Sequence, residues 1–216
     1  MKFVMSFSCG KDSIYALDRM LSEGHTPVAL IVACNKNSGR SFFHGADEAL
    51  LDAYADALGI PCIKTYADGE DYSEKFEEGL KKAKEMGAEA ACFGDICLLS
   101  SKKWNAGRAT AAGLEAVLPL WKKDNVQHVK DVIDAGYKCL IKIVDTDALS
   151  EEFLGKYLDE QVMKALEENE VDVCGENGEY HTIVTDGPIF KHPLDIQIGS
   201  IGKSGSCAYL ETEIIK

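Results

Sequence analysis

The stretch KFVMSFSCGKDSIYALDRMLSEG, residues 2–24, joins an apolar run to an amphipathic segment through a short polar loop. Residues 2–7 are typical of a strand, and the apolar side chains at positions 14, 17, 20 and 21 share one helical face. Gly24 stands where that helix would end. A strand, a loop of small residues and a helix in direct succession form the repeating unit of a sheet covered by helices.

The same alternation of apolar run, turn and amphipathic segment recurs after residue 24. Parallel strands need long crossover connections, which are usually helices. We therefore predict an α/β fold with a doubly wound parallel sheet, which binds ligands at the carboxyl ends of its strands. Strands are predicted over residues 27–34, 61–66, 90–93 and 116–120, and helices over residues 47–58, 72–86 and 104–112.

The alternation loosens after Trp121, which favours a second and smaller unit. We expect helices over residues 126–135 and 151–168, a strand over residues 138–144, and hairpins in the glycine-containing C-terminal segment. The predicted division is a nucleotide-binding domain over residues 1–122 and a substrate-binding α+β domain over residues 123–216.

The charge balance argues against polyanionic partners. The 216 residues include 36 acidic and 23 basic side chains, for a formal net charge of −13, so we expect no direct binding of nucleic acid or of an anionic membrane. No apolar run has the length of a membrane span, and the N-terminus lacks the features of a signal peptide. We expect a soluble, cytoplasmic protein, and the sequence leaves its oligomeric state open.

Eight cysteines are spread along the chain without a CxxC pair. A chain of this length does not need disulfide bridges, so reduced and buried thiols are expected. The five histidines form no HxxxH pair and do not pair with cysteines at zinc-finger spacing, so the sequence offers only weak support for a zinc site.

The loop of residues 8–13, Ser-Cys-Gly-Lys-Asp-Ser, has the composition of a phosphate site. Backbone N–H groups at a helix N-terminus attract anions, and small residues let a phosphate approach. Ser8 and Ser13 add hydroxyl donors, and Lys11 adds a cation. The Asp12 carboxylate would repel a phosphate unless Mg²⁺ lay between them. An ordinary turn, in which Asp12 or Ser13 caps the helix, remains the alternative.

This loop is not a Walker A motif, because Met5 stands where the motif needs glycine and Asp12 stands where it needs serine or threonine. A second Gly-Lys-Ser run, residues 202–204, lacks its upstream glycine, since position 197 is Gln197. Neither run therefore predicts a P-loop.

Residues 8–13 resemble the SGGxDS pyrophosphate loop of the N-type ATP pyrophosphatases, with Cys9 in place of the first glycine. Three further segments resemble the diphthine-ammonia ligase family of that superfamily. They are FGDI at residues 93–96, followed by LPLW at 118–121, and CGENGEYHT at 174–182, followed by DGPIF at 186–190. The resemblance covers most of the chain and implies an adenine nucleotide alpha hydrolase-like, Rossmann-like domain with a smaller C-terminal domain.

The resemblance also implies the residues that contact ATP. It assigns the phosphates to the loop, with Cys9 contributing its backbone amide, and gives Lys11 and Asp12 catalytic roles, Asp12 also binding Mg²⁺. Asp95 ends a predicted central strand, where it either contacts the ligand or caps the next turn, and His44 resembles a family segment that lines the nucleotide pocket. The full predicted set is Ser8, Cys9, Gly10, Lys11, Asp12, Ser13, His44, Gly94 and Asp95.

Residues 176–182 resemble the EGGEFET substrate loop of the family, with Asn177 and His181 replacing glycine and glutamate. This resemblance predicts substrate contacts from Glu176, Asn177, Gly178, Glu179, His181 and Thr182. The alternatives are a solvated acidic loop, a structural histidine at position 181, and a strand that begins at position 182.

By the same resemblance, the chain is an AMP-forming ligase that uses ATP and Mg²⁺. It would adenylate a carboxylate, release pyrophosphate and transfer ammonia to form an amide. Lys2 occupies the position of an N-terminal catalytic cysteine, so free ammonium is the expected donor. A complete resemblance makes the acceptor diphthine on elongation factor 2.

Two other functions remain open. One is a related ATP pyrophosphatase that acts on a small carboxylate or carbonyl compound, and the other is a non-catalytic module that binds adenine nucleotide. A tRNA thiolase is disfavoured by the acidic charge balance.

Overall fold

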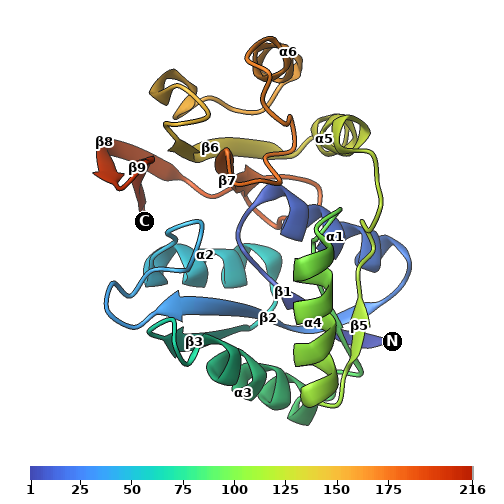
Figure 1. The fold of residues 1–216 in the computed structure, drawn as a ribbon. Coiled ribbons are helices and arrows are strands. Elements are labelled where there is room, and N and C mark those ends of the chain that lie inside the picture. The colour runs from blue at the N-terminus through green and yellow to red at the C-terminus, as the bar shows by residue number, and fades with distance from the viewer. Residues whose placement is uncertain (216) are drawn as a thin grey trace.

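The computed structural model describes residues 1–215, and a five-stranded parallel sheet organises its first half (Figure 1). The strands lie in the order β3-β2-β1-β4-β5, and each neighbouring pair is parallel. The predicted α/β fold with a doubly wound sheet is therefore confirmed. The strand bounds are β1 Lys2–Ser6, β2 Thr26–Asn35, β3 Cys62–Ala67, β4 Ala90–Cys92 and β5 Glu115–Val117.

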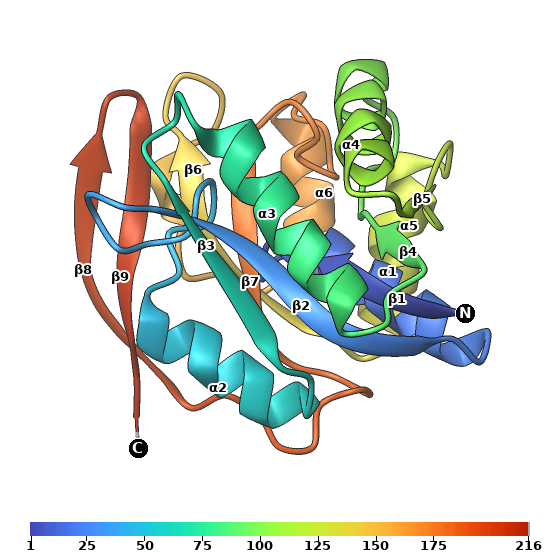
Figure 2. The ribbon, with the colours of Figure 1, turned by 90° about the horizontal axis from the view of Figure 1, so that it is seen from below.

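Helices cover both faces of this sheet because its central strands are apolar on both sides. Phe3 and Met5 of β1 pack in one cluster with α1 and α2, whereas Val4 packs in a second cluster with α3 and α4. Figure 2 shows α3 lying across β2 and β3. The helix bounds are α1 Lys11–Ser22, α2 Glu48–Leu58, α3 Tyr72–Glu85 and α4 Leu99–Ala111.

The second half of the chain builds a four-stranded antiparallel sheet in the order β7-β6-β9-β8. This arrangement confirms the smaller α+β part. Of the hairpins expected in the C-terminal segment, the structure has one, formed by β8 and β9. Strand β7 pairs with the earlier strand β6 and not with its neighbour in the chain, β8. The bounds are α5 Asn125–Asp134, β6 Lys138–Asp145, a short 3-10 helix Glu151–Phe153, α6 Glu160–Glu168, β7 Tyr180–Asp186, β8 Ile196–Ser204 and β9 Cys207–Ile214.

Two predicted helices have the wrong bounds. The helix expected over residues 151–168 is interrupted, because Gly155 takes a φ of 80° and the following segment hydrogen-bonds along β6. The amide of Ile141 donates to the carbonyl of Lys156, and the amide of Leu158 donates to that of Cys139. Helix α4 begins at Leu99 rather than at residue 104, because its first turn is polar apart from Leu99, which is exposed, and so shows no amphipathic pattern.

The two sheets share one apolar core. Helices α1 and α2 lie between them (Figure 1), and the cluster that holds Phe3 and Met5 continues through Leu140 and Tyr180 of the second sheet. The last strand of the parallel sheet ends at Val117 and α5 begins at Asn125. We keep a domain boundary between residues 122 and 123 as a proposal.

Two expectations concern the whole chain. All eight cysteines have free thiols, and five of them are buried, as predicted. Within residues 1–215 no helix has both the length and the apolar character needed to cross a membrane.

The Tyr54 hydroxyl ties the two halves together. Tyr54 is fully buried, and its hydroxyl lies at hydrogen-bond distance from two carbonyl oxygens, that of Val184 at 2.7 Å and that of Cys9 at 3.3 Å. Tyr54→Phe should lower the free energy of unfolding by about 1 to 2 kcal/mol, because it leaves buried acceptors without this donor. Urea denaturation measures the change. The control is Tyr66→Phe at a half-exposed position, and its free energy of unfolding should stay within about 0.5 kcal/mol of wild type. Equal losses in the two variants would contradict the bridging role of Tyr54.

Candidate functional site

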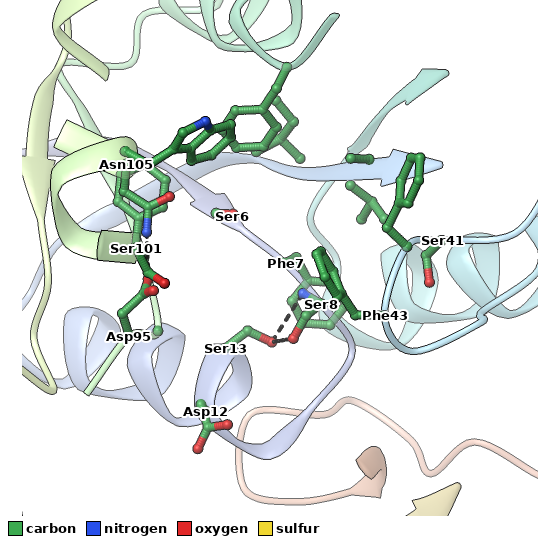
Figure 3. Close-up of a pocket in the computed structure, with 18 of the residues that line it drawn as sticks. Ser6, Phe7, Ser8, Asp12, Ser13, Ser41, Phe43, Asp95, Ser101 and Asn105 are labelled. Carbon is green, nitrogen blue, oxygen red and sulfur yellow. Dashed lines mark hydrogen bonds between the residues drawn. The ribbon is translucent and has the colours of Figure 1, made fainter. Parts of the chain in front are cut away.

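A cavity of about 660 Å³ opens at the carboxyl ends of β1, β2 and β4. The strand order changes direction between β1 and β4, so the loops that follow these strands diverge and leave a crevice. Figure 3 shows Ser8 and Ser13 between Asp95 and Asn105 on one side and Ser41 and Phe43 on the other. The volume is in the range of small-molecule and cofactor sites.

One wall of the cavity is aromatic. Trp104 of α4 lies 5.4 Å from Phe76 and 5.7 Å from Tyr72 between ring centroids, and Phe42 meets Tyr72 edge-on at 5.1 Å. Phe43 is 68% exposed and completes this wall at the cavity rim. Flat apolar surfaces of this kind suit a planar heterocycle.

The opposite wall is polar and comes from the loop after β1. The Ser8 hydroxyl donates to Ser13 Oγ at 3.1 Å, and the Ser13 hydroxyl donates to the Gly10 carbonyl at 3.0 Å. Helix α1 has Gly10 at its N-cap and no side-chain cap, so the alternative in which Asp12 or Ser13 caps the helix is wrong. The helix N-terminus therefore borders the cavity with hydroxyl groups beside it.

Cys9 shapes this loop through its backbone. Its φ of 73° lies in the left-handed region, and its carbonyl accepts from the Val184 amide at 3.0 Å. The side chain is fully buried, and burial raises the pKa of the thiol well above its usual value. Cys9 therefore keeps a protonated thiol that does not line the cavity, which disfavours a thiol reaction there.

Lys11 and Asp12 form an ion pair at the edge of the cavity. The Lys11 ammonium is buried, donates to Asp12 Oδ2 at 3.0 Å and to the Cys174 carbonyl at 2.5 Å, and does not line the cavity. Burial alone would raise the pKa of Asp12, but Lys11 and His128 outweigh it and hold that pKa well below its usual value. Asp12 is thus an anion at neutral pH, and it does line the cavity.

Gly94 lets β4 approach the start of α1. A Cβ at this position would lie 2.9 Å from the backbone of Asp12 and Ser13, too close for any side chain. The next residue, Asp95, lines the cavity and accepts from Asn105 Nδ2 at 2.6 Å. Burial, together with the nearby Glu176 and Asp12 carboxylates, raises the pKa of Asp95 to about 6 against the opposing effect of its hydrogen bonds.

His44 supports the loop from below. Its Nδ1 donates to the Thr182 carbonyl at 2.8 Å, and its ring would clash with a Cβ on Gly10. Burial, with His181 4.9 Å away between ring centroids, lowers the pKa of His44 to about 3. The Thr182 hydroxyl accepts from the Lys11 amide at 3.1 Å. His44, His181 and Thr182 therefore brace the loop and do not line the cavity.

Only one acidic side chain of the 176–182 segment reaches the cavity. Glu176 lines it and accepts from Cys97 Sγ at 3.4 Å, and burial raises the pKa of Glu176. Asn177 is exposed and donates to the Glu179 carboxylate through its amide nitrogen at 3.1 Å and Nδ2 at 3.0 Å. Asn177 and Glu179 are therefore engaged with each other, away from the cavity wall.

Two residues that contact Asp12 escaped prediction from the sequence. His128 Nε2 donates to Asp12 Oδ1 at 2.8 Å, and Cys174 Sγ lies 3.9 Å from the same oxygen. Their ligand atoms lie within 4.8 Å of one another, a spacing compatible with a metal ion. His128 lies 116 positions from Asp12 in the chain, so no motif spacing could reveal the contact.

The donor set of the cavity fits Mg²⁺ better than zinc. Asp12, Asp95 and Glu176 offer the oxygen ligands that Mg²⁺ prefers. His128 and Cys174 offer nitrogen and sulfur, but His128 Nε2 already donates to Asp12 Oδ1 at 2.8 Å. Asp12, the magnesium ligand predicted from the sequence, shares the cavity with two further carboxylates.

Family models and individual relatives of known proteins point to the same family. The model of the diphthamide synthase N-terminal domain matches residues 1–116, and the model of the C-terminal domain matches residues 124–213. Proteins named diphthine–ammonia ligase are 26% identical in Schizosaccharomyces pombe and 27% identical in Danio rerio. These matches cover 99% and 91% of this chain, and 39% and 86% of the two relatives.

A mouse protein of the same name is 26% identical over 90% of this chain and 82% of its own. A solved chain from Methanocaldococcus jannaschii, described as a predicted subunit of tRNA methyltransferase, aligns over 90% of this chain and 100% of its own. Its TM-score is 0.45 at 15% identity, which is too low to support an argument.

Gly94 and Gly107 offer a matched pair of substitutions. Gly94→Ala places a methyl group against the backbone of α1 and should lower the free energy of unfolding by about 1 to 3 kcal/mol. Gly107 lies within α4, and a methyl group there would meet open space, so Gly107→Ala should raise the same quantity by about 0.5 to 1 kcal/mol. Chemical denaturation measures both, and changes of the same sign would contradict the close approach.

The raised pKa of Asp95 predicts a pH-dependent effect of Asp95→Asn. In the wild type, folding favours the protonated Asp95 carboxyl, because its pKa is higher in the folded chain than in the unfolded chain. The stability that this carboxyl contributes is fully present below pH 4 and is lost as the pH rises through about 6. The variant should match wild type near pH 4 and exceed its stability by up to about 3 kcal/mol at pH 8. Urea denaturation in chelator measures the difference, and a constant difference across this range would contradict the cause.

Proposed function

The chain belongs to the diphthamide synthase family, and from this premise we propose that it is an ATP-dependent ligase that converts a carboxylate to an amide with ammonia. The proposed acceptor is diphthine on elongation factor 2. The relatives named diphthine–ammonia ligase support both the reaction and the acceptor.

One observation carries the ATP part of the proposal: the cavity has an aromatic wall at one side and the serine-rich start of α1 at the other. An adenine ring would lie against Trp104 and Tyr72, and the phosphates would extend toward Ser8 and Ser13. Such a polarity gradient matches a nucleoside triphosphate, since the base is apolar and the phosphates attract backbone N–H groups.

In the proposed reaction, a carboxylate oxygen of the acceptor attacks the α-phosphorus of ATP, and pyrophosphate leaves with the electrons of the broken P–O bond. Ammonia then attacks the carbonyl carbon of the acyl adenylate and loses a proton, and AMP leaves. The protein contributes positioning of the two reactants and stabilisation of the departing charge. No protein nucleophile is required.

Lys11 acts indirectly in this proposal. Its ammonium points at Asp12 and Cys174 instead of at the cavity, so it fixes the loop and the carboxylate. Asp12 would hold Mg²⁺, which when bound neutralises charge on the triphosphate, and Asp95 and Glu176 line the same cavity. Cys9 and Gly10 do not line the cavity and would support the phosphate-binding loop through their backbone, with the His44 ring packed against Gly10.

The acceptor would approach over the 176–182 segment. We propose that Glu176 contacts ammonium or the acceptor inside the cavity, and that Asn177, Gly178, Glu179, His181 and Thr182 shape the entrance around it. Elongation factor 2 would dock on this side. The cytoplasm, where that factor acts, would be the site of the reaction.

The proposal is tested by incubating the chain with ATP, Mg²⁺, ammonium and elongation factor 2 that carries diphthine. We expect AMP and pyrophosphate in equal amounts and the mass change of an acid-to-amide conversion on the factor. Production of ADP, or no turnover, would contradict the ligase. AMP formation that depends on a small carboxylate compound and not on the factor would contradict the proposed acceptor but support the proposed reaction.

Asp12→Asn should reduce the rate of AMP formation by about a hundredfold or more, because it removes the anionic cavity ligand closest to the loop. Circular dichroism and thermal unfolding should show that the variant folds. Asp56→Asn, an exposed carboxylate on α2, is the matched control and should keep the wild-type rate. A wild-type rate in Asp12→Asn would remove that residue from the reaction.

A further inference from the structure

We propose that His128 is a positioning residue that holds the Asp12 carboxylate in its working orientation from outside the ATP-binding half. The inference rests on the proposed function, because the working orientation is the one that presents Asp12 to a metal-bound triphosphate. His128 does not touch the cavity; it acts through Asp12.

The carboxylate of Asp12 is held at both oxygens. Oδ1 accepts from His128 Nε2 at 2.8 Å, and Oδ2 accepts from Lys11 Nζ at 3.0 Å. Each carboxylate oxygen has two lone pairs, and Cys174 Sγ lies 3.9 Å from Oδ1 as a second donor, so the lone pair still free to face the cavity is on Oδ2. Two donors at fixed positions hold the carboxylate in one orientation, and a carboxylate that binds a metal ion needs such a fixed orientation.

The contacts of His128 make it a donor in a defined tautomer. An ionised carboxylate can only accept, so Nε2 carries the proton. Nδ1 has no hydrogen-bond partner among residues 1–215. We therefore assign a proton to Nε2, which donates it to Asp12.

Helix α5 fixes the ring in place. His128 is fully buried, its ring meets that of Tyr15 edge-on at 5.5 Å, and Val129 and Val132 anchor the helix in the core. Asp124 caps the helix by accepting from the Gln127 amide. A ring enclosed on all these sides cannot follow a displaced carboxylate, so it defines the position of Asp12.

The competing assignment is a transition metal held by Asp12, His128 and Cys174. The geometry favours the hydrogen bond. His128 Nε2 and Asp12 Oδ1 lie 2.8 Å apart, the length of a direct hydrogen bond, and a metal ion bound by Nε2 would need that nitrogen without its proton. The two assignments differ in what they require of Cys174. A metal ion would need its thiolate, whereas the hydrogen bond between His128 and Asp12 does not.

The test uses the full chain with two substitutions at position 128. His128→Leu removes the donor and keeps an apolar side chain, whereas His128→Gln supplies an amide N–H at the place of Nε2. Calorimetry measures the affinity for ATP with Mg²⁺ and for ATP in chelator. We expect His128→Leu to lose about tenfold or more of the Mg²⁺-dependent gain in affinity, and His128→Gln to stay within about threefold of wild type.

A control variant separates positioning from stability. Val132→Ala weakens the packing of α5 without touching Asp12, so it should lower the melting temperature and keep the Mg²⁺-dependent gain. In turnover, His128→Leu should lower kcat for AMP formation by about tenfold and change KM for ATP by less than about threefold. A merely structural histidine would give the same result as Val132→Ala.

A spectroscopic measurement tests the inference in the free protein. Nitrogen-15 NMR should show a proton on Nε2 of His128, and Asp12→Asn should shift the resonances of the ring. A ring whose single proton is on Nδ1 would overturn the proposal. A cobalt titration that produces a thiolate absorption band, lost in Cys174→Ser, would also overturn it, because His128 would then be a metal ligand.

The two proposals fail separately. If the Mg²⁺-dependent gain depends on His128 but no AMP forms with diphthine-bearing elongation factor 2, the proposed function is wrong and the positioning role stands. If AMP forms and His128→Leu behaves as wild type in both binding and turnover, the positioning role is wrong and the function stands. A wild-type chain that binds no ATP overturns both.

Discussion

The hydrogen bond from the Val184 amide to the Cys9 carbonyl is the constraint on which the site depends. Cys9 adopts a left-handed φ of 73°, which costs a residue with a Cβ about 1 to 2 kcal/mol. Strand β7 compensates by holding that carbonyl, and Thr182 of the same strand accepts from the next helix amide, that of Lys11. The loop that borders the cavity therefore takes its shape from a strand in the other half of the chain. The cavity, the hydroxyls of Ser8 and Ser13 that line it, and the position of the Asp12 carboxylate all follow from this docking.

The parallel sheet could be predicted because its strands are continuous apolar runs separated by helices of clear periodicity. The loop after β1 could be predicted as a site because the first strand of such a sheet lies at the change of direction. Asp95 followed from the same rule applied to β4, and Gly94 from the family resemblance of residues 93–96. Glu176 reaches the cavity wall as the resemblance implied, although its contact with Cys97 connects segments that local sequence cannot relate.

Other features lie beyond sequence patterns for physical reasons. In the sequence, His128 is one more polar residue on an amphipathic helix, and its role exists only because α5 packs against α1. Lys11 looked like a phosphate ligand by its position in the loop, but the Cys174 carbonyl draws its ammonium under the loop. The break in the helix after residue 153 arises because the segment gains more by pairing with β6 than by continuing its turns, and pairing of this kind is a tertiary effect.

The docking of β7 against the turn at Cys9 also bears on the order of events during synthesis. The residues of the turn leave the ribosome early, whereas their partners at positions 182 and 184 leave late, and the contact closes a loop of most of the chain. Long-range contacts of this kind form slowly, since chain entropy must be lost before they contribute. The nascent parallel sheet can therefore assemble on its own strands while its ligand-facing bend stays unformed. Competence to hold a nucleotide would be acquired only after the residues at positions 182 and 184 have been made, well after the residues of the turn itself.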